Sequence, residues 1–394
     1  MQTLPPPDAD ALAHSAHLRE VIQEQMIAAG GSLPFWKFME LALYAPGLGY
    51  YSAGATKVGD AGDLGAAPEG SPLLAAGVAD ALTPVLQQLG PDAQFMEIGG
   101  GSGAFAETCL SKLLANDALP ARYAILEPSA DLRERQRERL QERLPPLLFE
   151  LVEWLDGPIQ ESWNGVLFAN EVIDALPTPR FTIRDGEVFE EHVALDGEGR
   201  FLRSDRPADP MLASAVRHVE RQLPQPFAEG YRSELLAQLP YWLQAVIGGM
   251  GDGALLFVDY GHARGEYYQP QRRDGTLRAF RRHHVVADVF AHPGLQDITA
   301  SVDFTALAEA CSGAGFDFTG YCSQASFLLG NRLQENLAMA ESRAQDDTAR
   351  HNLRQQVKLL TLPSEMGERF QAIGFQRGVE FGAAFLAGDL SHRL

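Results

Sequence analysis

Cysteine is scarce in this chain of 394 residues, which contains only three. Cys109, Cys311 and Cys322 are widely separated, and no two of them form a Cys-x-x-Cys pair. This spacing argues against a disulfide framework and against a zinc site, so we expect no bound metal. Such cysteine usage is typical of a reducing compartment, and we expect a cytoplasmic protein.

Basic residues are also in short supply. The chain has 32 lysines and arginines against 52 aspartates and glutamates, which gives a formal net charge of −20. A charge of this sign disfavours binding to nucleic-acid phosphates, so we expect no nucleic-acid partner. The same field would attract a protein substrate with a cationic side chain. An acidic surface permits a homodimer without requiring one.

Long apolar runs are missing as well. No stretch reaches the ~18 apolar residues of a membrane-spanning helix. The N-terminal residues lack the basic start and apolar centre of a secretory signal, and they are not the arginine-rich pattern of a mitochondrial presequence. Hydrophobic residues still make up 45% of the chain, which is ordinary for a folded protein. We therefore expect a folded protein with no membrane partner.

The most informative stretch is residues 95–105, where a short apolar run ends at an acid and enters a glycine-rich turn. The run predicts a strand, and the residues from Ala104 onward predict a helix. Together they are typical of the first unit of a nucleotide-binding α/β sheet. Gly99, Gly101 and Gly103 allow positive φ and a close approach of the backbone to a ligand. Buried tight turns also use glycines, so a purely structural loop is the alternative.

Two kinds of cofactor fit this loop. Gly99, Gly101 and Ala104 match the dinucleotide fingerprint, whereas Glu97 followed by the three alternate glycines matches an S-adenosyl-L-methionine (SAM) loop equally well. Glu97 favours SAM, because the ammonium group of SAM needs a nearby carboxylate, reached directly or through water. A pyrophosphate would be repelled by that charge.

The second strand adds a candidate contact to the ribose. Residues 123–127 predict a strand that ends in Glu127, 24 positions after Gly103. A carboxylate at this tip can accept hydrogen bonds from both ribose hydroxyl groups. Pro128 and Ser129 then open the next helix, and we count both among the cofactor-binding residues.

A third strand is predicted over residues 148–151. Trp154 follows it, at a position that commonly flanks the adenine ring in such sheets. We include Trp154 among the cofactor-binding residues, although its ring would equally suit the core.

The fourth strand ends in a polar tract that we assign to catalysis. Residues 165–169 predict a strand, and Asn170, Glu171 and Asp174 follow it, where open α/β sheets place the ligand crevice. If this segment is helical, Asp174 lies one turn beyond Glu171 and both carboxylates share one face. The alternative is an N-cap followed by acids that favour the helix dipole.

Composition and periodicity divide the chain into four segments. Residues 1–90 are expected to hold N-terminal helices and a lid loop, 91–180 the SAM-binding core, 181–250 an inserted cap region, and 251–394 the rest of the sheet with C-terminal helices. Residues 1–15 read as a loose tail. The remaining element predictions are helices over 16–29, 35–44, 73–89, 131–144, 332–360 and 365–372, a hairpin over 181–189, and strands over 253–261, 316–321 and 379–385.

Eight tracts, in a fixed order, carry a family resemblance. They are residues 47–51, 62–63 with 67–69, 97–103, 126–129, 169–171 with 174–177, 259–261, 275–278, and 297–299 with 302–304. With these tracts the chain resembles the MidA-like class I SAM-dependent methyltransferases, a family related to a mitochondrial arginine methyltransferase of complex I assembly. The resemblance covers about residues 35–385.

The resemblance implies an α/β fold: a Rossmann-like class I methyltransferase sheet with helices on both faces, an N-terminal helical cap and an inserted α/β cap. It implies SAM-dependent methylation of a protein substrate on arginine. The cofactor-binding residues would be Glu97, Gly99, Gly101, Gly103, Glu127, Pro128, Ser129, Trp154 and Asn170. The catalytic residues would be Asn170, Glu171 and Asp174, and the substrate-binding residues Gly62, Asp63, Pro68, Glu69, Asp259 and Tyr260.

The first loop departs from the family pattern. Similar proteins have an aromatic residue after the Gly-Asp pair and a hydroxyl residue before Ala-Pro-Glu, whereas this chain has Leu64 and Ala66 there. If this loop shapes the substrate entrance, the substrate differs from that of the relatives.

Two other functions stay open at this point. A nicotinamide oxidoreductase would use the same glycine loop with Glu127 on the ribose, but no catalytic Tyr-Lys or His-Asp pair is evident at the strand tips. A non-catalytic assembly scaffold would keep the fold without needing the glycines, Glu127 or the Asn170-Glu171 pair.

Overall fold

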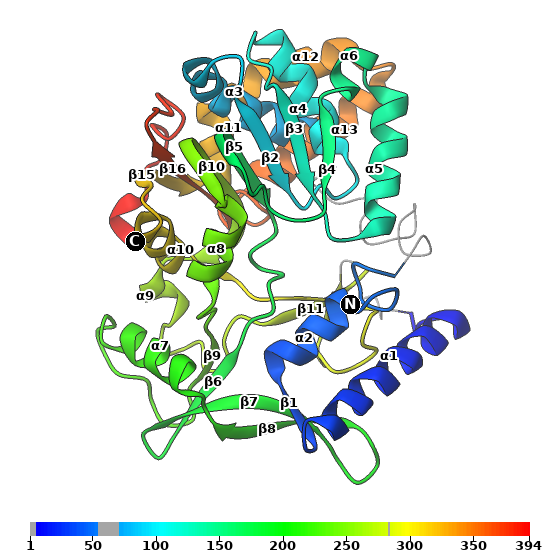
Figure 1. Cartoon of the computed structure of the whole chain (residues 1–394), viewed down its shortest axis with the longest axis vertical. Helices are drawn as coiled ribbons and strands as arrows, with labels where there is room; N and C mark the ends of the chain where they lie inside the picture. The colour runs from blue at the N-terminus through cyan, green and yellow to red at the C-terminus, as the bar shows by residue number, and fades with distance from the viewer. Residues whose placement is uncertain (1–4, 54–70, 283) are drawn as a thin grey trace. The chain divides into compact units, whose positions relative to one another are not determined.

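The computed structural model describes residues 5–53, 71–282 and 284–394. The chain forms two compact units, each assembled from separate stretches of sequence (Figure 1). The core unit comprises Leu64–Val172, Leu239–Gly261 and Val302–Leu394, and the accessory unit comprises Met1–Asp63, Ile173–Gln238 and His262–Ser301, in both cases as far as they are described.

A mixed sheet with the strand order β15-β16-β10-β5-β2-β3-β4 organises the core unit. Numbered along the chain, these seven strands lie in the order 6-7-5-4-1-2-3. The five strands from β10 to β4 are parallel, whereas β16 is antiparallel to both of its neighbours. The strands are β2 (Gln94–Ile98), β3 (Arg122–Leu126), β4 (Val152–Leu155), β5 (Ser162–Asn170), β10 (Gly249–His262), β15 (Asp317–Ser323) and β16 (Phe370–Arg377), and the short β14 (Val302–Asp303) also pairs with β10.

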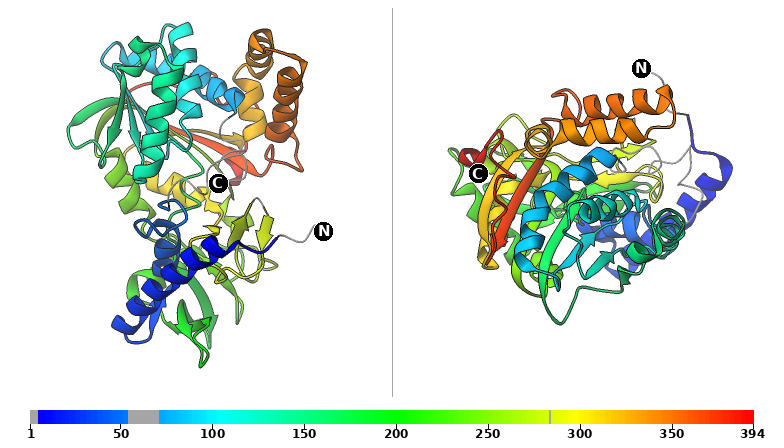
Figure 2. Two further views of the ribbon diagram at one scale, coloured as in Figure 1. Left: turned by 90° about the vertical axis from the view of Figure 1, so that its right-hand side faces the viewer. Right: turned by 90° about the horizontal axis from the view of Figure 1, so that it is seen from above.

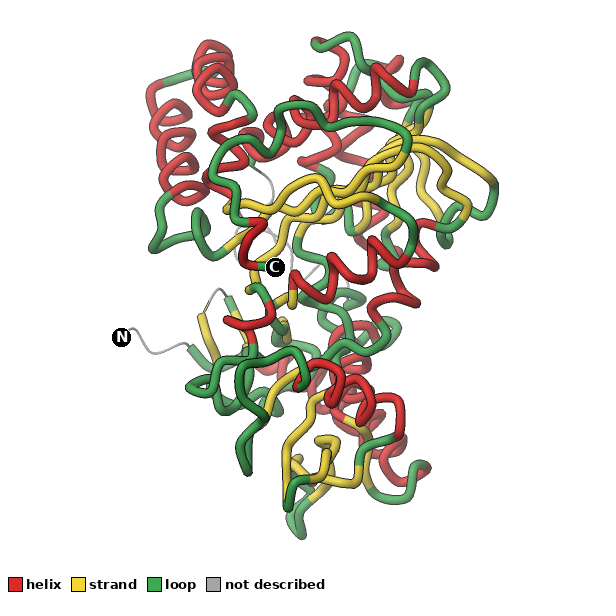
Figure 3. The backbone as a smooth tube through the Cα atoms, turned by 90° about the vertical axis from the view of Figure 1, so that its left-hand side faces the viewer, coloured by secondary structure: helices red, strands yellow, loops and turns green. Residues whose placement is uncertain are grey.

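Helices cover both faces of this sheet (Figures 2 and 3). The largest hydrophobic cluster joins α3, α4 and α11 to the strands, and it includes the fully buried side chains of Phe95, Phe168 and Phe327. This layering confirms the class I methyltransferase fold. The helices of the unit are α3 (Pro72–Leu89), α4 (Ala104–Ala115), α5 (Ala130–Arg143), α6 (Pro146–Phe149), α8 (Leu239–Ile247), α10 (Phe304–Gly313), α11 (Gln324–Gly330), α12 (Leu333–Arg343) and α13 (Asp347–Thr361) with a final 3-10 turn, η3 (Ser391–Arg393).

The described residues of the accessory unit form two smaller sheets and four helices. One sheet has the order β1-β7-β6-β9 with β8 paired to β7, and the other has the order β12-β11-β13. The predicted hairpin is confirmed: Asp185 and Gly186 both have positive φ, as a two-residue type I′ turn requires. The elements are β1 (Ser32–Pro34), β6 (Arg180–Arg184), β7 (Glu187–Leu195), β8 (Phe201–Pro207), β9 (Arg232–Glu234), β11 (Arg278–Arg281), β12 (His284–Val286), β13 (Asp297–Thr299), α1 (Ala9–Ala28), α2 (Phe35–Tyr44), α7 (Pro210–Glu220) and α9 (Arg264–Tyr267).

A buried ion network ties the accessory unit together. Arg180 lies 2.8 Å from Glu191 and 2.9 Å from Glu234, and all three side chains are fully buried. Burial alone would lower the pKa of Arg180, but the two carboxylates raise it above its ordinary value. The Thr276 N–H and hydroxyl donate to Glu234 at 2.7 and 3.0 Å. Gly275, with φ of +71°, lets the backbone pass Glu234 where a Cβ would overlap the carboxylate.

Two predictions near the front of the chain are wrong. Residues 1–15 are not all loose, because α1 begins at Ala9, where the Asp8 carboxylate caps it by accepting the Ala11 N–H at 2.8 Å. Residues 148–151 are not a strand. Pro146 occupies the first turn of the short helix α6, and the strand β4 begins later, at Val152.

Predictions near the C-terminus also need correction. The helix expected over 332–360 is two helices, α12 and α13, and Asp346 caps the second by accepting the Ala349 N–H at 2.7 Å. The segment 365–372, predicted as a helix, leads into strand β16, and no strand forms over 379–385. A short apolar run that is buried on both faces has no periodicity that separates strand from helix.

The segments predicted from composition do not coincide with the two compact units. The accessory unit draws on residues before 64, on much of the 181–250 segment and on residues 262–301, whereas α3 and α8 belong to the core unit. Within the described ranges, no helix is both long and apolar enough to cross a membrane.

Candidate active site

The glycine loop connects β2 to α4 as the sequence predicts. Gly99, Gly101 and Gly103 have φ of +71°, +50° and +79°, which side chains rarely tolerate. The Gly99 N–H donates to the Leu126 carbonyl at 3.0 Å, which fastens the start of the loop to the end of β3. Gly103 is the N-cap of α4, so the free N–H groups of the first helical turn follow it directly.

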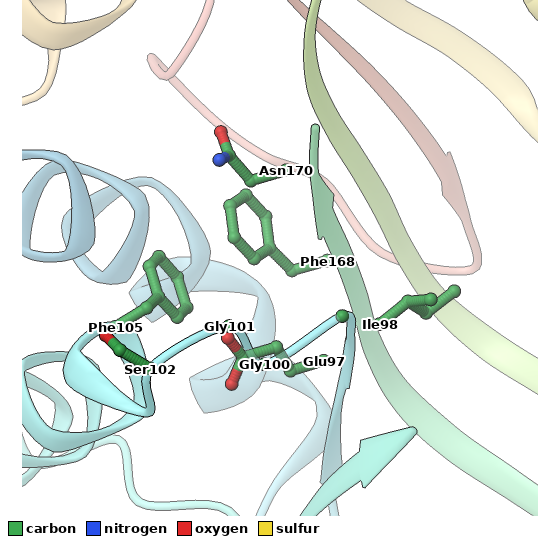
Figure 4. A pocket seen from close by; sticks show the side chains of 9 residues that line it. Glu97, Ile98, Gly100, Gly101, Ser102, Phe105, Phe168 and Asn170 are labelled. Atoms are coloured by element: carbon green, nitrogen blue, oxygen red, sulfur yellow. The ribbon is translucent and has the colours of Figure 1, made fainter. Parts of the chain in front are cut away.

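A pocket opens beside this loop in the core unit. It is lined by Glu97, Ile98, Gly99, Gly100, Gly101, Ser102, Phe105, Phe168 and Asn170 (Figure 4). The rings of Phe105 and Phe168 stack with their centroids 4.5 Å apart. The Asn170 amide nitrogen donates to Glu171 at 3.4 Å, whereas its buried Oδ1 has no hydrogen-bond partner among the described residues. A buried acceptor of this kind normally has a donor, so a bound ligand fits the pocket.

Glu97 is almost completely buried at the end of β2, with 3% of its side chain exposed. The Tyr123 hydroxyl donates to Glu97 Oε2 at 2.7 Å. Burial raises the pKa of the Glu97 carboxyl to about 8, although the Tyr123 hydrogen bond lowers it. The carboxyl group of Glu97, in the wall of the pocket, therefore has a pKa close to neutral pH.

Glu127 follows β3 directly and is also buried. Its Oε1 accepts the Ser129 N–H at 3.0 Å, and its Oε2 accepts the Gln136 amide at 3.3 Å. Burial raises the pKa of Glu127, while these hydrogen bonds and Arg133 oppose the rise. Ser129 also caps α5 by accepting the Leu132 N–H at 3.3 Å, so the turn around Pro128 holds the carboxylate of Glu127 in place.

Two residues at this edge were missed by sequence reasoning. Gln136 bridges Glu127, the glycine loop and Trp154, and Arg133 donates to the Glu127 carbonyl and to Asp156 at the end of β4. Both lie on α5, whose charged sequence predicts only a solvated surface. No local signal distinguishes these two residues from their neighbours.

Trp154 lies within strand β4 and not after it, because the third strand begins later than predicted. Its indole N–H donates to Gln136 Oε1 at 2.9 Å, and the Arg137 guanidinium lies 4.8 Å from the ring centroid. The side chain is partly buried. Its contact with the adenine ring stays a prediction.

Asn170 is the last residue of β5 and Glu171 follows it, both in the core unit, but the segment after them is not helical. Glu171 has φ of +52°, in the left-handed region, and its N–H donates to the Val258 carbonyl at 3.0 Å. The prediction that Glu171 and Asp174 share one helix face is therefore wrong. Asp174 belongs to the accessory unit, where its carbonyl accepts the Ala300 N–H at 2.9 Å.

Of the candidate substrate-binding residues, the structure describes only Asp259 and Tyr260. Asp259 and Tyr260 lie on β10 in the core unit, and the buried Asp259 carboxylate accepts the Tyr260 N–H at 2.8 Å. The Tyr260 ring contacts Phe370, with 5.6 Å between their centroids. Gly62, Asp63, Pro68 and Glu69 lie outside the described residues.

The residues of the pocket fit SAM better than a dinucleotide. Glu97 in the pocket wall offers a partner to an ammonium group, which favours its ionised form, whereas a pyrophosphate would have no use for an acid there. The carboxylate of Glu127 still has acceptor capacity for a hydroxyl group beside the hydrogen bonds from Ser129, Gln136 and the Gly100 backbone. A Cβ on Gly99 would lie 3.1 Å from the Val172 side chain, so the loop needs glycine to keep its close path.

Comparison with known proteins decides the family. The model of a family described as "Putative S-adenosyl-L-methionine-dependent methyltransferase" matches residues 77–322. The chain belongs to this family. A solved structure from Burkholderia thailandensis, bound to S-adenosyl-homocysteine (SAH), is 40% identical, with a TM-score of 0.89 and 100% of both chains covered.

Curated relatives agree with this membership. The Drosophila melanogaster protein named "Protein arginine methyltransferase NDUFAF7 homolog, mitochondrial" is 26% identical over 95% of this chain and 88% of its own length. The corresponding Danio rerio protein is 31% identical over 52% of this chain and 46% of its own length. This member of the family is a SAM-dependent methyltransferase, and its cofactor is SAM. The oxidoreductase and scaffold alternatives are thereby set aside.

Proposed function

We propose that this methyltransferase transfers its methyl group to a guanidino nitrogen of arginine in a protein substrate. Three observations support the acceptor. The curated relatives carry the name protein arginine methyltransferase, and the chain has a formal net charge of −20. The third observation is the carboxylate of Glu171, which follows the pocket residue Asn170. A cationic side chain is the kind of substrate that such charges attract.

The conformation of Glu171 is the observation that carries the proposal. A non-glycine residue at φ of +52° is uncommon and strained, and strain of this kind gathers at functional sites. The residue adjoins Asn170, which lines the pocket, and Asn170 donates to its carboxylate. The left-handed turn thus holds an acid at the carboxyl end of β5, where a parallel sheet places its ligands.

The chemistry needs such an acid. SAM, when bound, supplies a methyl group attached to a sulfonium. As the carbon–sulfur bond breaks, a bond forms from the methyl carbon to a guanidino nitrogen, which gives up one proton. A guanidinium is a poor nucleophile because its lone pairs are delocalised. We expect Glu171 to accept hydrogen bonds from the guanidinium, to localise its charge away from the attacking nitrogen, and to receive the proton.

The proposal extends to residues that no contact yet links to a substrate. Asp259 and Tyr260 of the core unit are proposed to bind the acceptor side chain. A catalytic role for Asp174, and substrate binding by Gly62, Asp63, Pro68 and Glu69, likewise stay proposals. We also propose that the protein acts in the cytoplasm, although its curated eukaryotic relatives are named mitochondrial.

The test uses SAM with a deuterated methyl group and a protein extract from cells that lack this protein. Mass spectrometry should find the deuterated methyl group on arginine in reactions with the intact protein. The variant Gly101→Val should bind no cofactor and give no label, because valine at φ of +50° would distort the loop.

Glu171→Gln separates chemistry from cofactor binding. It should keep its SAH affinity within about threefold while the labelling rate falls by roughly a hundredfold or more, the usual size of a lost acid–base contribution. Glu142→Gln, on the exposed side of α5, is the matched control and should behave like the parent. Label on lysine or on a small molecule would contradict the arginine assignment while leaving the methyltransferase itself intact.

A further inference from the structure

Gln136 makes three hydrogen bonds at the cofactor edge of the core sheet. Its side chain lies on α5 and has no exposed surface. The amide nitrogen donates to the Gly101 carbonyl at 2.9 Å and to Glu127 Oε2 at 3.3 Å, and the amide oxygen accepts the Trp154 indole N–H at 2.9 Å. One side chain therefore joins the glycine loop, the acid after β3 and the aromatic side chain on β4.

The chemistry of the partners fixes the orientation of this amide. The indole N–H can only donate, and the carbonyl of Gly101 and the carboxylate of Glu127 can only accept. If the amide were turned over, its oxygen would face two acceptors and its nitrogen would face a donor. Only a group that accepts on one side and donates twice on the other satisfies all three partners.

Packing alone gives no reason for a polar residue here. The other buried side chains of α5 are Leu132 and Leu140, four residues before and after Gln136, so this position lies on the apolar stripe of the helix. Burying an amide costs free energy unless hydrogen bonds compensate, and a leucine or methionine would fill the space without that cost. The contacts of the amide explain why glutamine occupies the position.

The glycine loop is shaped around the same side chain. A Cβ on Gly100 would lie 3.0 Å from the Gln136 amide nitrogen, and a Cβ on Gly103 would lie 3.3 Å from its Cα. The loop thus approaches α5 closely only because these residues are glycines. Gln136 defines the distance between the loop and the helix.

We propose that Gln136 is a positioning residue for the cofactor. It holds the Gly101 carbonyl, the ribose-binding carboxylate of Glu127 and the indole of Trp154 in one arrangement before SAM arrives. It also donates a hydrogen bond to the Glu127 carboxylate, which favours the ionised form that accepts hydroxyl groups. The residue acts through these three groups and not by touching the reacting atoms.

The decisive variant is Gln136→Glu, which keeps the shape but changes the hydrogen-bonding character with pH. When ionised, the new carboxylate cannot donate and repels Glu127. When protonated, it can donate one hydrogen bond while it still accepts the Trp154 N–H. We expect this variant to bind SAH roughly ten- to a hundredfold more weakly than the parent at pH 8, and within about threefold of the parent at pH 5.5.

Calorimetric titration with SAH measures the affinity of each variant relative to the parent, and it needs no methyl acceptor. Taking the ratio to the parent at each pH removes any pH dependence that both proteins share. Gln136→Met loses all three hydrogen bonds and should bind roughly ten- to a hundredfold more weakly at both pH values. Gln141→Met, at an exposed position of the same helix, is the matched control and should leave the affinity unchanged.

Trp154 provides a second readout in the cofactor-free protein. Its emission should shift in Gln136→Met but not in Gln141→Met, and the shift should vanish when Trp154→Phe is combined with Gln136→Met. The effects of Gln136→Met and Trp154→Phe on SAH affinity should also be non-additive, because the two side chains share a hydrogen bond.

A purely structural role would give other results. The proposal is overturned if Gln136→Glu weakens SAH binding by the same factor at both pH values, or if it binds like the parent at both. If Gln136→Met does not fold, the isosteric Gln136→Glu alone decides the question.

Discussion

The ionisation of Glu97 leads to a prediction about how cofactor binding depends on pH. In the cofactor-free protein, burial raises the pKa of Glu97 to about 8, so its neutral form outnumbers the ionised form by about ten to one at pH 7. An ammonium group beside it would favour the ionised form. We therefore expect binding at pH 7 to release about 0.9 proton from Glu97.

The sign of the affinity change follows from this release. Below the raised pKa of Glu97, binding must first remove the proton from its carboxyl group, which reduces the net binding free energy. Above this pKa the carboxylate is already ionised. The cost at pH 7 is about 1.4 kcal/mol, so SAH affinity should rise with pH above 7, by at most roughly tenfold, as long as the ammonium group of SAH stays protonated.

Titration calorimetry in buffers with different ionisation enthalpies counts the released protons. Glu97→Gln should release almost none at pH 7. Tyr123→Phe removes the hydrogen bond that lowers the pKa of Glu97. The rise of SAH affinity with pH should therefore occur at a higher pH in this variant. The reasoning is refuted if the parent and Glu97→Gln release equal numbers of protons at pH 7.

Two glycine pairs give further predictions. Gly100→Val should abolish SAH binding, because its Cβ would lie 2.8 Å from the Ile125 side chain beneath the loop, whereas Gly157→Val, with no atom within 4 Å of its Cβ, should bind normally in the same titration. Gly275→Ala and Gly230→Ala both place alanine at positive φ, which costs roughly 1–2 kcal/mol, but only the first also meets a buried carboxylate. Denaturant unfolding should show a clearly larger loss of stability for Gly275→Ala, and equal losses would contradict the account of the ion network.

Much of the core unit could be predicted from local patterns. The glycine loop, the strand before Glu127 and the hairpin at Asp185-Gly186 are each marked by residues whose conformational preferences act locally. Helix α6 and strand β16 were misread because short apolar runs do not reveal their period.

The site was predicted only where side chains follow strands. Gly99, Gly101, Glu97 and Asn170 do line one pocket, whereas Gly103 is not in its lining. Gln136 was not predicted, because its contacts are with Gly101 and Trp154, which lie 35 and 18 positions away in the sequence. The turn at Glu171 escaped notice because its left-handed conformation has no signature in a glutamate.

The position of β16 has a consequence for how the protein is made. This strand lies between β10 and β15, and it is the only strand that pairs with β15 among the described residues. During synthesis, residues 370–377 leave the ribosome long after the first six strands of the sheet. Until then, the backbone of β10 that pairs with β16 lacks its partner, and neighbouring apolar side chains such as Leu255 and Phe257 lack part of their cover. Such an edge can aggregate or bind a chaperone. A truncation before residue 370 would thus remove the strand that joins β15 to the rest of the sheet, leaving β15 detached from the strands that carry the cofactor pocket.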